Sequence, residues 1–546
     1  MAVKLQEMLF QAMSDPTFYP HEVRGPTQLE THISKVFLTG PYVYKIKKQV
    51  DLGFANFTSL EQRRFFCDQE VLLNQRLTDG IYLGVIPIGH DGLQFRLNAS
   101  ENVVEYAVKM RQLPAAATMR NRLSDDRINR NDLYRLAARL ADFHETARTV
   151  TDPSVRAYAQ SACTENFRQI MPYSGKMLDA GQYDFIRAAT FNYFIRYRNL
   201  FEKRIASNRF RDCHGDLRAD HVYFTADGRI QILDCIEFNE RLRLVDTASD
   251  LAFLIMDLEY RRNSEAAREL LRSYYDRCDD LGMPALMDFY KCYRAMVRCK
   301  VNCIRLGSQD LSSQLRSVLT ANAQRYLHLA HYYARRFSRP TIWVFCGLPG
   351  SGKSTLAAGL ADLLAIESRN SDRVRKEMAG LSPLARGNGP ADQGIYKPEM
   401  SAKVYDHLYN MACKAVAECR SLILDATYSA VAHRDSLRHL ADDCGSRILF
   451  AECRTGDDGL RRRLTRRETA PSVSDARTAH LGLLKARFDP LLEIPPAQHV
   501  VLDTGGTRET CLRQLLSAAY LDKVDPWPGM PSDRVPSVRS VQEPVA

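Results

Sequence analysis

The sequence lacks the segments that mark a membrane-spanning or secreted protein. No apolar run approaches the roughly 20 residues that a membrane-spanning helix needs. The opening residues, MAVKLQEMLFQAM, contain Glu7 and have no continuous apolar core, unlike a secretory signal peptide. None of the 14 cysteines belongs to a CxxC pair. We therefore expect a reduced, cytoplasmic setting and no membrane partner.

A strong charge of one sign is also lacking. The chain has 75 Lys and Arg against 65 Asp and Glu, so the net charge is 75 − 65 = +10 over 546 residues. This mild excess is compatible with polyanionic ligands such as nucleotides, but it is weak evidence for the wrapping of nucleic acid. The sequence has no internal repeat, and its length predicts two or more domains with full-sized cores.

The order of strand-like and helical patterns predicts four segments. A strand hairpin that turns at Gly40 and Pro41 precedes a helix, two more strands and a mostly helical stretch, which RIQILDCIEF interrupts as a strand pair. After Pro340 an apolar strand, a glycine-rich loop and a helix begin a strand–helix alternation, which favours a parallel α/β sheet. The Pro- and Ser-rich ending predicts a disordered tail. The predicted segments are an N-terminal helical extension (1–29), an α+β domain (30–338), an α/β domain (339–522) and the tail (523–546).

The glycine-rich loop has the full phosphate-binding pattern G-x-x-x-x-G-K-[ST], here GLPGSGKS, between a strand and a helix. Its glycines let successive backbone N–H groups point at phosphate oxygens, and the helix N-terminus adds a positive dipole. Lys353 is predicted to reach the β- and γ-phosphates of ATP, and the Ser354 hydroxyl to bind Mg²⁺. The predicted nucleotide-binding residues are Gly347, Leu348, Pro349, Gly350, Ser351, Gly352, Lys353, Ser354 and Thr355.

Charged residues downstream of this loop suit phosphoryl transfer. Asp372 and Arg375, in SDRVRKEM, follow the next predicted strand, where Asp372 can act as general base and Arg375 can hold an acceptor phosphate. Asp425 ends the strand of LILDAT and suits the Mg²⁺ site; a helix cap or a turn is the alternative role for either aspartate. Arg463 and Arg467, in LRRRLTRRE, are one helical turn apart and suit a lid that neutralises the transferred group, or else a solvated basic face.

These motifs together resemble those of P-loop kinases, in particular the polynucleotide-kinase-like and zeta-toxin-like domains. The resemblance covers about 340–522 and implies a P-loop NTPase fold that uses ATP and Mg²⁺. Because family members phosphorylate varied acceptors, it implies no substrate.

The stretch CHGDLRADHVYF, 213–224, has the pattern of a phosphotransferase catalytic loop. In such loops an Asp orients the acceptor hydroxyl, an Asn five residues later binds a metal ion, and an Asp beyond a short hairpin binds a second ion. Asp216 and Asp234 suit the two aspartates, and VYFTADGRIQIL reads as the hairpin, with an Asp-Gly turn at 227–228. His221 stands at the asparagine position. Imidazole can bind a divalent metal, but Mg²⁺ prefers oxygen, so Mn²⁺ is an alternative ion.

Other parts of a kinase-like site occur upstream in chain order. Lys45 and Val43, in YVYKIKK, share a strand face, which would bring a lysine to the phosphates and a small apolar residue to the adenine. Lys47 has the same parity and is the rival lysine. Glu70, on the following helix, is predicted to pair with Lys45.

The segment of about 30–330 resembles the aminoglycoside phosphotransferase/choline kinase family, on HGD and the motifs above. It is most similar to bacterial two-domain proteins that join such a unit to a P-loop kinase-like domain. The resemblance implies a protein-kinase-like α+β fold, a second ATP site, and an Asp250 that braces the catalytic-loop backbone. His221 and a first hairpin with the single glycine Gly40 depart from the family pattern. Glu237 is an alternative oxygen ligand, and the role of Arg218 stays open between acceptor, phosphate and solvent.

Zinc binding is an alternative role for four residues in or near this loop, which are Cys213, His214, His221 and Cys235. Adjacent residues such as Cys213 and His214 do not easily bind one ion, and structural zinc sites use ligands two to four residues apart. Buried thiols and, for His144 on its apolar helix, a core histidine are favoured instead.

The sequence as a whole predicts a two-domain ATP-dependent phosphotransferase with a small-molecule acceptor. One alternative is a nucleotide-gated regulatory protein whose N-terminal domain is catalytically weak. The other is a polynucleotide 5′-hydroxyl kinase, which would make nucleic acid a partner.

Overall fold

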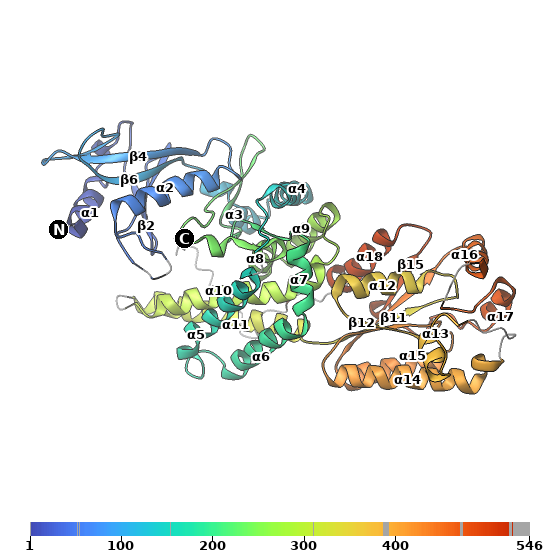
Figure 1. Cartoon of the computed structure of the whole chain (residues 1–546). Coiled ribbons are helices and arrows are strands. Elements are labelled where there is room, and N and C mark those ends of the chain that lie inside the picture. Colours follow the sequence, from blue (N-terminus) through green and yellow to red (C-terminus); the bar gives the residue numbers. More distant parts are fainter. Residues whose placement is uncertain are drawn as a thin grey trace. The chain divides into compact units, whose positions relative to one another are not determined.

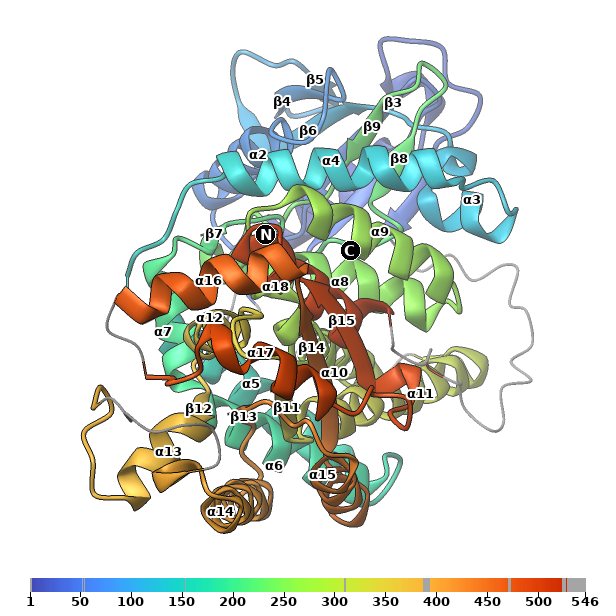
Figure 2. The ribbon, with the colours of Figure 1, turned by 90° about the vertical axis from the view of Figure 1, so that its right-hand side faces the viewer.

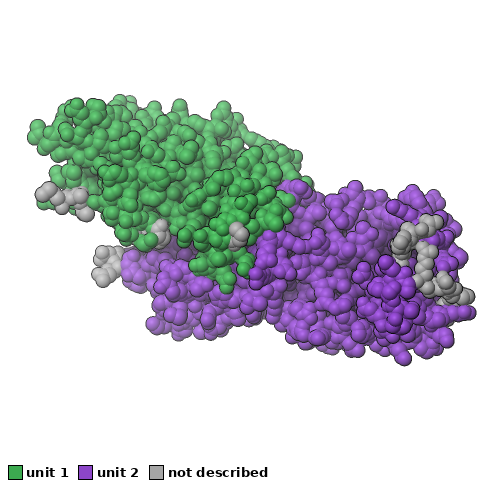
Figure 3. Space-filling model, viewed as in Figure 1, with its two compact units in different colours: residues 1–162, 204–277, 528–546 green, residues 163–203, 278–527 purple. Residues whose placement is uncertain are grey.

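The computed structural model describes residues 2–51, 53, 55–152, 154–308, 311–385, 393–469, 473–522 and 527. The chain divides into two compact units, which Figure 3 colours separately. The first comprises Met1–Ala162, Arg204–Arg277 and Pro528–Ala546, and the second comprises Cys163–Lys203 and Cys278–Trp527. The helices of 278–337 therefore belong to the same unit as the C-terminal sheet. The predicted tail, 523–546, lies outside the described residues apart from Trp527.

The first unit contains a six-stranded sheet in which every neighbouring pair is antiparallel (Figure 1). Its strand order is β1-β2-β3-β6-β4-β5. The predicted hairpin turning at Gly40 and Pro41 is confirmed as β2 and β3. The strands are β1 (Thr27–Glu30), β2 (Ser34–Leu38), β3 (Tyr42–Lys47), β4 (Tyr82–His90), β5 (Phe95–Leu97) and β6 (Val103–Arg111).

Side chains along β3 point alternately to the two faces of this sheet. Tyr44 and Ile46 pack in a cluster with residues of α1 (Ala2–Ala12). Val43 points to the opposite face, where it packs with Cys67 of α2 (Leu60–Asn74). Because side chains alternate along a strand, Lys45 and Lys47 share the α2 face with Val43.

Two short antiparallel strand pairs flank the predicted catalytic loop. β8 (Val222–Phe224) pairs with β9 (Ile230–Ile232), which confirms the predicted hairpin. β7 (Phe210–Asp212) pairs with β10 (Leu244–Asp246), a pairing that was not predicted. The prediction of a strand pair within 229–238 is wrong in its second half, where no strand follows β9.

The remaining helices of the first unit include the almost wholly buried α8. They are α3 (Met119–Ser124), α4 (Arg130–Thr146), α8 (Thr247–Tyr260) and α9 (Ser264–Arg277). The residues of α5 (Ser154–Ile170) and α7 (Arg198–Ala206) are divided between the two units.

The second unit contains a sheet of five parallel strands, which confirms the predicted α/β class. Along β11, Ile342 and Val344 pack toward α14 and α15, whereas Trp343 and Phe345 pack toward α12 and α18. Figures 1 and 2 show these helices on the two faces of the sheet. The strands are β11 (Thr341–Cys346), β12 (Glu367–Asn370), β13 (Leu422–Asp425), β14 (Arg447–Arg454) and β15 (His499–Asp503).

The strand order, β12-β13-β11-β14-β15, reverses direction beside β11. In open α/β sheets ligands bind at such a point, outside the carboxyl ends of the strands. Within the described part of the chain, no helix is long and apolar enough to cross a membrane. The helices of this unit are α6 (Ala180–Arg196), α10 (Met287–Leu306), α11 (Ser313–Phe337), α12 (Lys353–Leu364), α13 (Ser371–Met378), α14 (Pro398–Ala417), α15 (Val431–Asp443), α16 (Asp457–Thr469), α17 (Leu481–Ala486) and α18 (Arg508–Ser517).

Candidate functional site

The predicted phosphate-binding loop lies between the carboxyl end of β11 and the start of α12. Its three glycines, Gly347, Gly350 and Gly352, have φ angles of 127°, 84° and 97°. These angles lie in the left-handed region that favours glycine. At Gly347 a Cβ atom would also stand 2.5 Å from the backbone oxygen of Cys453. The loop therefore needs glycine for its shape, as the motif predicts.

Lys353 lies across this loop. Its Nζ donates a hydrogen bond of 2.9 Å to the backbone oxygen of Leu348, and the residue is only 9% exposed. Burial lowers the pKa of Lys353. Ser354, the next residue, is exposed on the first turn of α12. Lys353 is thus held against the loop, and the Ser354 side chain is open to solvent next to it; their contacts with phosphate and metal stay predictions.

Asp425 ends β13 and is buried beside this loop. Its Oδ2 accepts a hydrogen bond of 2.6 Å from Nδ2 of Asn370, and its Oδ1 is buried without a hydrogen bond from any described residue. An unsatisfied buried carboxylate oxygen suits a cation. With the Ser354 hydroxyl it provides the hard oxygen ligands that Mg²⁺ prefers. The residues present fit the predicted Mg²⁺ site.

Asp372 lies on the first turn of α13, but it does not cap that helix. The cap is Asn370, whose Oδ1 accepts hydrogen bonds from the backbone nitrogens of Asp372 and Arg373. The carboxylate of Asp372 interacts with the charges of Arg375, Asp425 and Lys353, and burial raises its pKa. Asp372 therefore belongs to the charged cluster at the carboxyl ends of the strands.

Arg375 is buried against polar and aromatic side chains of the second unit. Its Nη1 donates a hydrogen bond of 3.2 Å to the Ser401 hydroxyl, and its guanidinium lies 4.8 Å from the ring centroid of Tyr396. Its Nε is 3.9 Å from Oδ1 of Asp372 and is buried without a hydrogen bond to any described residue. Sequence reasoning missed Tyr396 and Ser401, because they lie beyond the motifs.

The two predicted lid arginines of α16 differ from their neighbours on that helix. Arg463 donates to the backbone oxygen of Gly350 at 3.3 Å and to the hydroxyl of Thr504 at 3.0 Å, so it braces the phosphate loop. Burial lowers the pKa of Arg467, and Asp372 and Asp425 act in the opposite direction. Arg467 is therefore close enough to these two carboxylates to feel their charge. The exposed basic residues of the helix are Arg461, Arg462 and Arg466.

In the first unit, Lys45 joins the residues predicted to hold it. Its Nζ lies 3.0 Å from Oε1 of Glu70 and 2.8 Å from Oδ1 of Asp234. Burial acts to lower the pKa of Lys45, but the surrounding carboxylates raise it well above its ordinary value. The predicted ion pair between Lys45 and Glu70 is present.

The rival lysine, Lys47, has different partners. Its side chain is fully buried, and its Nζ pairs with the carboxylates of Glu70 and Glu237. Glu237, considered as an oxygen ligand for a metal, is thus engaged by a lysine. Lys45 is the lysine that contacts Asp234, the predicted metal-binding residue.

The catalytic loop holds Asp216 against a buried arginine. Arg218 is 4% exposed, and its Nε and Nη2 lie 3.1 Å from the two carboxylate oxygens of Asp216. Nη2 also lies 3.0 Å from Nε2 of His221. Arg218 therefore faces neighbouring side chains of the loop and not solvent.

Two aspartates of α8 fix the backbone of this loop. Asp250 accepts hydrogen bonds from the backbone nitrogens of His214 and Gly215, at 3.0 and 2.8 Å. This confirms the bracing role that the family resemblance implies for Asp250. Asp257, two turns further along α8, accepts from the nitrogen of Ala219 at 3.0 Å. Its position in the apolar run LIMDL is the signal that could have identified it.

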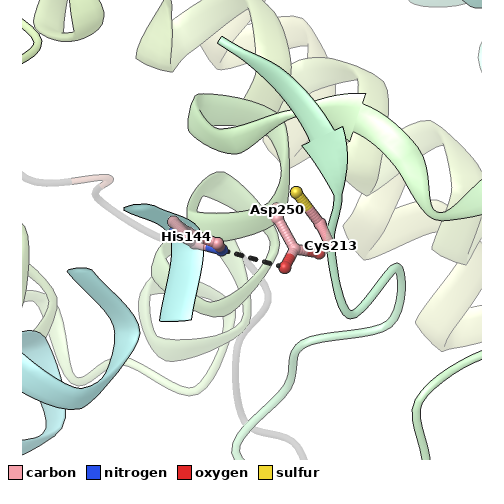
Figure 4. A group of neighbouring side chains, drawn as sticks. All are labelled: His144, Cys213 and Asp250. Carbon is pink, nitrogen blue, oxygen red and sulfur yellow. Dashed lines mark hydrogen bonds and ion pairs between the residues drawn. The ribbon is translucent and has the colours of Figure 1, made fainter. Parts of the chain in front are cut away.

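His144, Cys213 and Asp250 lie close enough together to suggest a metal site (Figure 4). However, Nε2 of His144 lies 3.2 Å from Asp250 Oδ2, and its Nδ1 lies 2.8 Å from the hydroxyl of Tyr274. The carboxylate of Asp250 already holds backbone N–H groups. Burial raises the pKa of Cys213 well above its ordinary value, which keeps the thiol protonated. Because these polar atoms are satisfied within the fold, the cluster does not fit a metal ion, and His144 is a core residue.

Nearby, Nε2 of His214 lies 2.8 Å from the backbone oxygen of Leu233. Burial lowers the pKa of His214 to about 4, so the ring is neutral at physiological pH. The Cys235 thiol donates to the backbone oxygen of His214 at 3.3 Å. These partners agree with the structural role that the sequence favours over zinc.

Comparison with known proteins gives matches over both parts of the chain. Residues 342–491 match the family described as AAA domain. Among solved structures, a choline/ethanolamine kinase family protein from Mesorhizobium loti is 14% identical, with a TM-score of 0.35, and the match covers 60% of this chain and 99% of that one. A gluconokinase from Sinorhizobium meliloti is 16% identical, with a TM-score of 0.25, over 33% of this chain and 91% of that one.

Longer matches come from mycobacteria. The uncharacterized proteins Rv2004c of Mycobacterium tuberculosis and Mb2027c of Mycobacterium bovis are each 30% identical to this chain over 495 residues. The match covers 89% of this chain and 93% of each relative. This chain belongs to the same protein family as these mycobacterial proteins.

Proposed function

We propose that the second unit transfers a phosphoryl group from ATP to a hydroxyl group of a small molecule. The observation that carries this proposal is the position of Asp372, a partly buried carboxyl group that interacts with Lys353, Asp425 and Arg375 beside the phosphate-binding loop. Binding of a nucleotide alone needs no such base, whereas phosphoryl transfer to a hydroxyl group uses one.

Each residue of this cluster has a role in the proposed reaction. Lys353 and the backbone N–H groups of the loop hold the β- and γ-phosphates. Ser354 and the free oxygen of Asp425 would hold Mg²⁺, which when bound neutralises charge on the phosphates. The acceptor oxygen forms a bond to the γ-phosphorus as the bond to the β-phosphate oxygen breaks. Asp372 takes the proton of the acceptor hydroxyl group, and ADP leaves.

The environment of Arg375 favours an acceptor that carries an anionic or oxygen-rich group. Its Nε is buried without a hydrogen bond to the described residues, close to the carboxylate of Asp372. Such a guanidinium N–H gains most from a charged partner. We propose that Arg375 binds a phosphate or carboxylate of the acceptor, next to the hydroxyl group that Asp372 deprotonates.

For the first unit we propose a second, kinase-like ATP site in the aminoglycoside phosphotransferase manner. Lys45 would contact the phosphates, Asp234 would hold a divalent ion, and Asp216 would orient an acceptor. The Lys45 contacts with Glu70 and Asp234 support this assignment. Use of ATP at both sites fits the cytoplasmic setting that the sequence predicts.

The proposal is tested by label transfer from γ-labelled ATP to a pool of bacterial metabolites. The full chain is compared with Asp216→Asn, Lys353→Ala and Lys403→Ala, the last changing an exposed lysine of α14 as a control. We expect labelled product with the unaltered chain and with the control. In Lys353→Ala, the product made by the second unit should be absent. A product that disappears only in Asp216→Asn would assign transfer to the first unit instead. Label found only on 5′-hydroxyl ends of added polynucleotides would make the protein a polynucleotide kinase.

A further inference from the structure

The catalytic loop contains a cation of its own between its carboxylates. Arg218 lies within 3.2 Å of Asp216 through three contacts, and its Nη1 lies 3.5 Å from Oδ2 of Asp220. Asp220 is in turn held by Arg261 at 2.7 Å and by Arg120 at 3.3 Å. Arg218 is 4% exposed, so its charge lies in a desolvated environment. Its electrostatic interactions are stronger there than they would be on the surface.

His221 occupies the position at which kinase-like sites carry a metal-binding asparagine, but its ring nitrogens are engaged. Nδ1 lies 2.8 Å from the backbone oxygen of Asp216, which can only accept, so Nδ1 carries the proton. Nη2 of Arg218, which can only donate, lies 3.0 Å from Nε2, so Nε2 accepts this hydrogen bond. A metal ion at His221 would need the lone pair that the Arg218 N–H group occupies. Mg²⁺ also prefers oxygen over imidazole. The second divalent ion of kinase-like sites therefore does not fit here.

We propose that the first unit is a one-metal site in which Arg218 supplies the positive charge that a second divalent ion supplies in kinase-like sites. In this arrangement His221 is a positioning residue, which holds the Arg218 guanidinium against Asp216. The remaining ion belongs to Asp234, whose carboxylate also contacts Lys45. This inference rests on the proposed nucleotide binding by the first unit.

The charge balance of the loop agrees with this assignment. Asp216 and Asp220 are both close to Arg218, and a guanidinium keeps its charge at every physiological pH. A further divalent cation beside this guanidinium would meet like-charge repulsion in a desolvated site. Replacement of Arg218 by an uncharged side chain removes that repulsion, together with the contacts of the guanidinium to Nε2 of His221 and to Asp216.

The test counts Mn²⁺ ions bound to the full chain in the presence of a saturating, non-hydrolysable ATP analogue, by the electron paramagnetic resonance signal of free Mn²⁺. Nucleotide stoichiometry is measured in parallel by equilibrium dialysis. We expect two nucleotides and two Mn²⁺ ions per chain, one ion for each unit. His221→Ala leaves this count unchanged, Asp234→Asn lowers it by one, and Arg218→Met raises it by one. Arg218→Lys, which keeps a cation, leaves it unchanged.

Three Mn²⁺ ions per unaltered chain, or the loss of one ion in His221→Ala with both nucleotides retained, would overturn the proposal. These two results do not depend on whether Arg218→Met folds. A single nucleotide per chain that Lys45→Met does not remove would instead show that the first unit binds no ATP. In that case the proposed function of the first unit and this inference both fail, while the second unit is untouched.

Discussion

Nδ2 of Asn370 donates a hydrogen bond of 2.6 Å to Oδ2 of Asp425, and this contact orients the carboxylate that suits Mg²⁺. The same asparagine caps α13 through its Oδ1, which accepts from the backbone nitrogens of Asp372 and Arg373. One side chain therefore joins the predicted metal carboxylate to the helix that carries the predicted base and the acceptor-binding arginine. The proposed sites for ATP and acceptor are thus linked at the carboxyl ends of β12 and β13.

Loss of this link should weaken metal binding by the second unit. In Asn370→Ala, Asp425 keeps its charge but loses the amide that orients it, so we expect the affinity for Mn²⁺ with nucleotide to fall about 10–100-fold, as for other residues that orient metal ligands. Asp425→Asn should lower the affinity for Mn²⁺ at least as much. Asp442→Asn, which changes an exposed residue of α15, serves as the control. Unchanged Mn²⁺ affinity in both site variants would show that Asp425 does not hold the ion.

The pH dependence of transfer by the second unit should report Asp372. Burial raises the pKa of this carboxyl group above its usual range near 3.9. A base acts only when ionised, so the rate should fall as pH is lowered through this raised pKa, at a higher pH than for an exposed aspartate. Asp372→Asn should slow transfer about 10²–10⁴-fold and remove the acid limb. Asp406→Asn, an exposed position on α14, should keep both rate and limb. An acid limb that persists in Asp372→Asn would assign it to another group.

Replacement of the two lysines of β3 should have different effects, one mainly on nucleotide affinity and the other mainly on stability. Lys45→Met removes the cation next to Asp234, but Glu70 keeps Lys47 as a partner, so the main expected loss is nucleotide affinity of the first unit. Lys47→Met leaves Glu70 with Lys45 as a partner but removes the buried ion pair of Glu237. Breaking a buried pair in this way costs about 3–5 kcal/mol, so the loss of stability should be larger here. Urea unfolding and binding of a fluorescent ATP analogue measure the two effects. The reverse pattern would make Lys47 the nucleotide-binding lysine.

Asp250 and Asp257 should protect different parts of the catalytic loop from hydrogen exchange. Asp250→Ala leaves the N–H groups of His214 and Gly215 without their acceptor, and Asp257→Ala does the same for Ala219. Each buried donor left unpaired costs about 1–3 kcal/mol, so amide exchange should speed up locally at those positions. Asp276→Ala, at an exposed site of α9, provides the comparison. Equal protection of the loop in all three variants would refute the bracing role.

Local patterns in the sequence predicted the parts of both sites that depend on neighbouring residues in the chain. The phosphate loop, the hairpin at Gly40 and the parallel sheet follow from spacing and periodicity alone. The pairing of Lys45 with Glu70 was also accessible, because strand parity and the next helix place the two side chains on one face.

Contacts between distant segments were not accessible in this way. The pairing of β7 with β10, the link from Asn370 to Asp425, and the bracing of the phosphate loop by Arg463 depend on tertiary placement. The sequence does not decide the role of Arg218 for a similar reason, since only burial distinguishes a basic residue at a site from one in solvent. The sequence likewise gives no signal that the helices of 278–337 form one compact unit with the C-terminal sheet.

Phosphoryl transfer by the second unit is tested most directly by the rate of ADP release with and without a metabolite pool. The Asp216→Asn chain is used, so that the first unit does not contribute, and Lys353→Ala in the same background sets the baseline. We predict ADP release that rises severalfold when the pool is added and that falls to the baseline in Lys353→Ala. A rate that depends on Lys353 but is the same with and without the pool would contradict phosphoryl transfer and favour a nucleotide-gated regulatory protein.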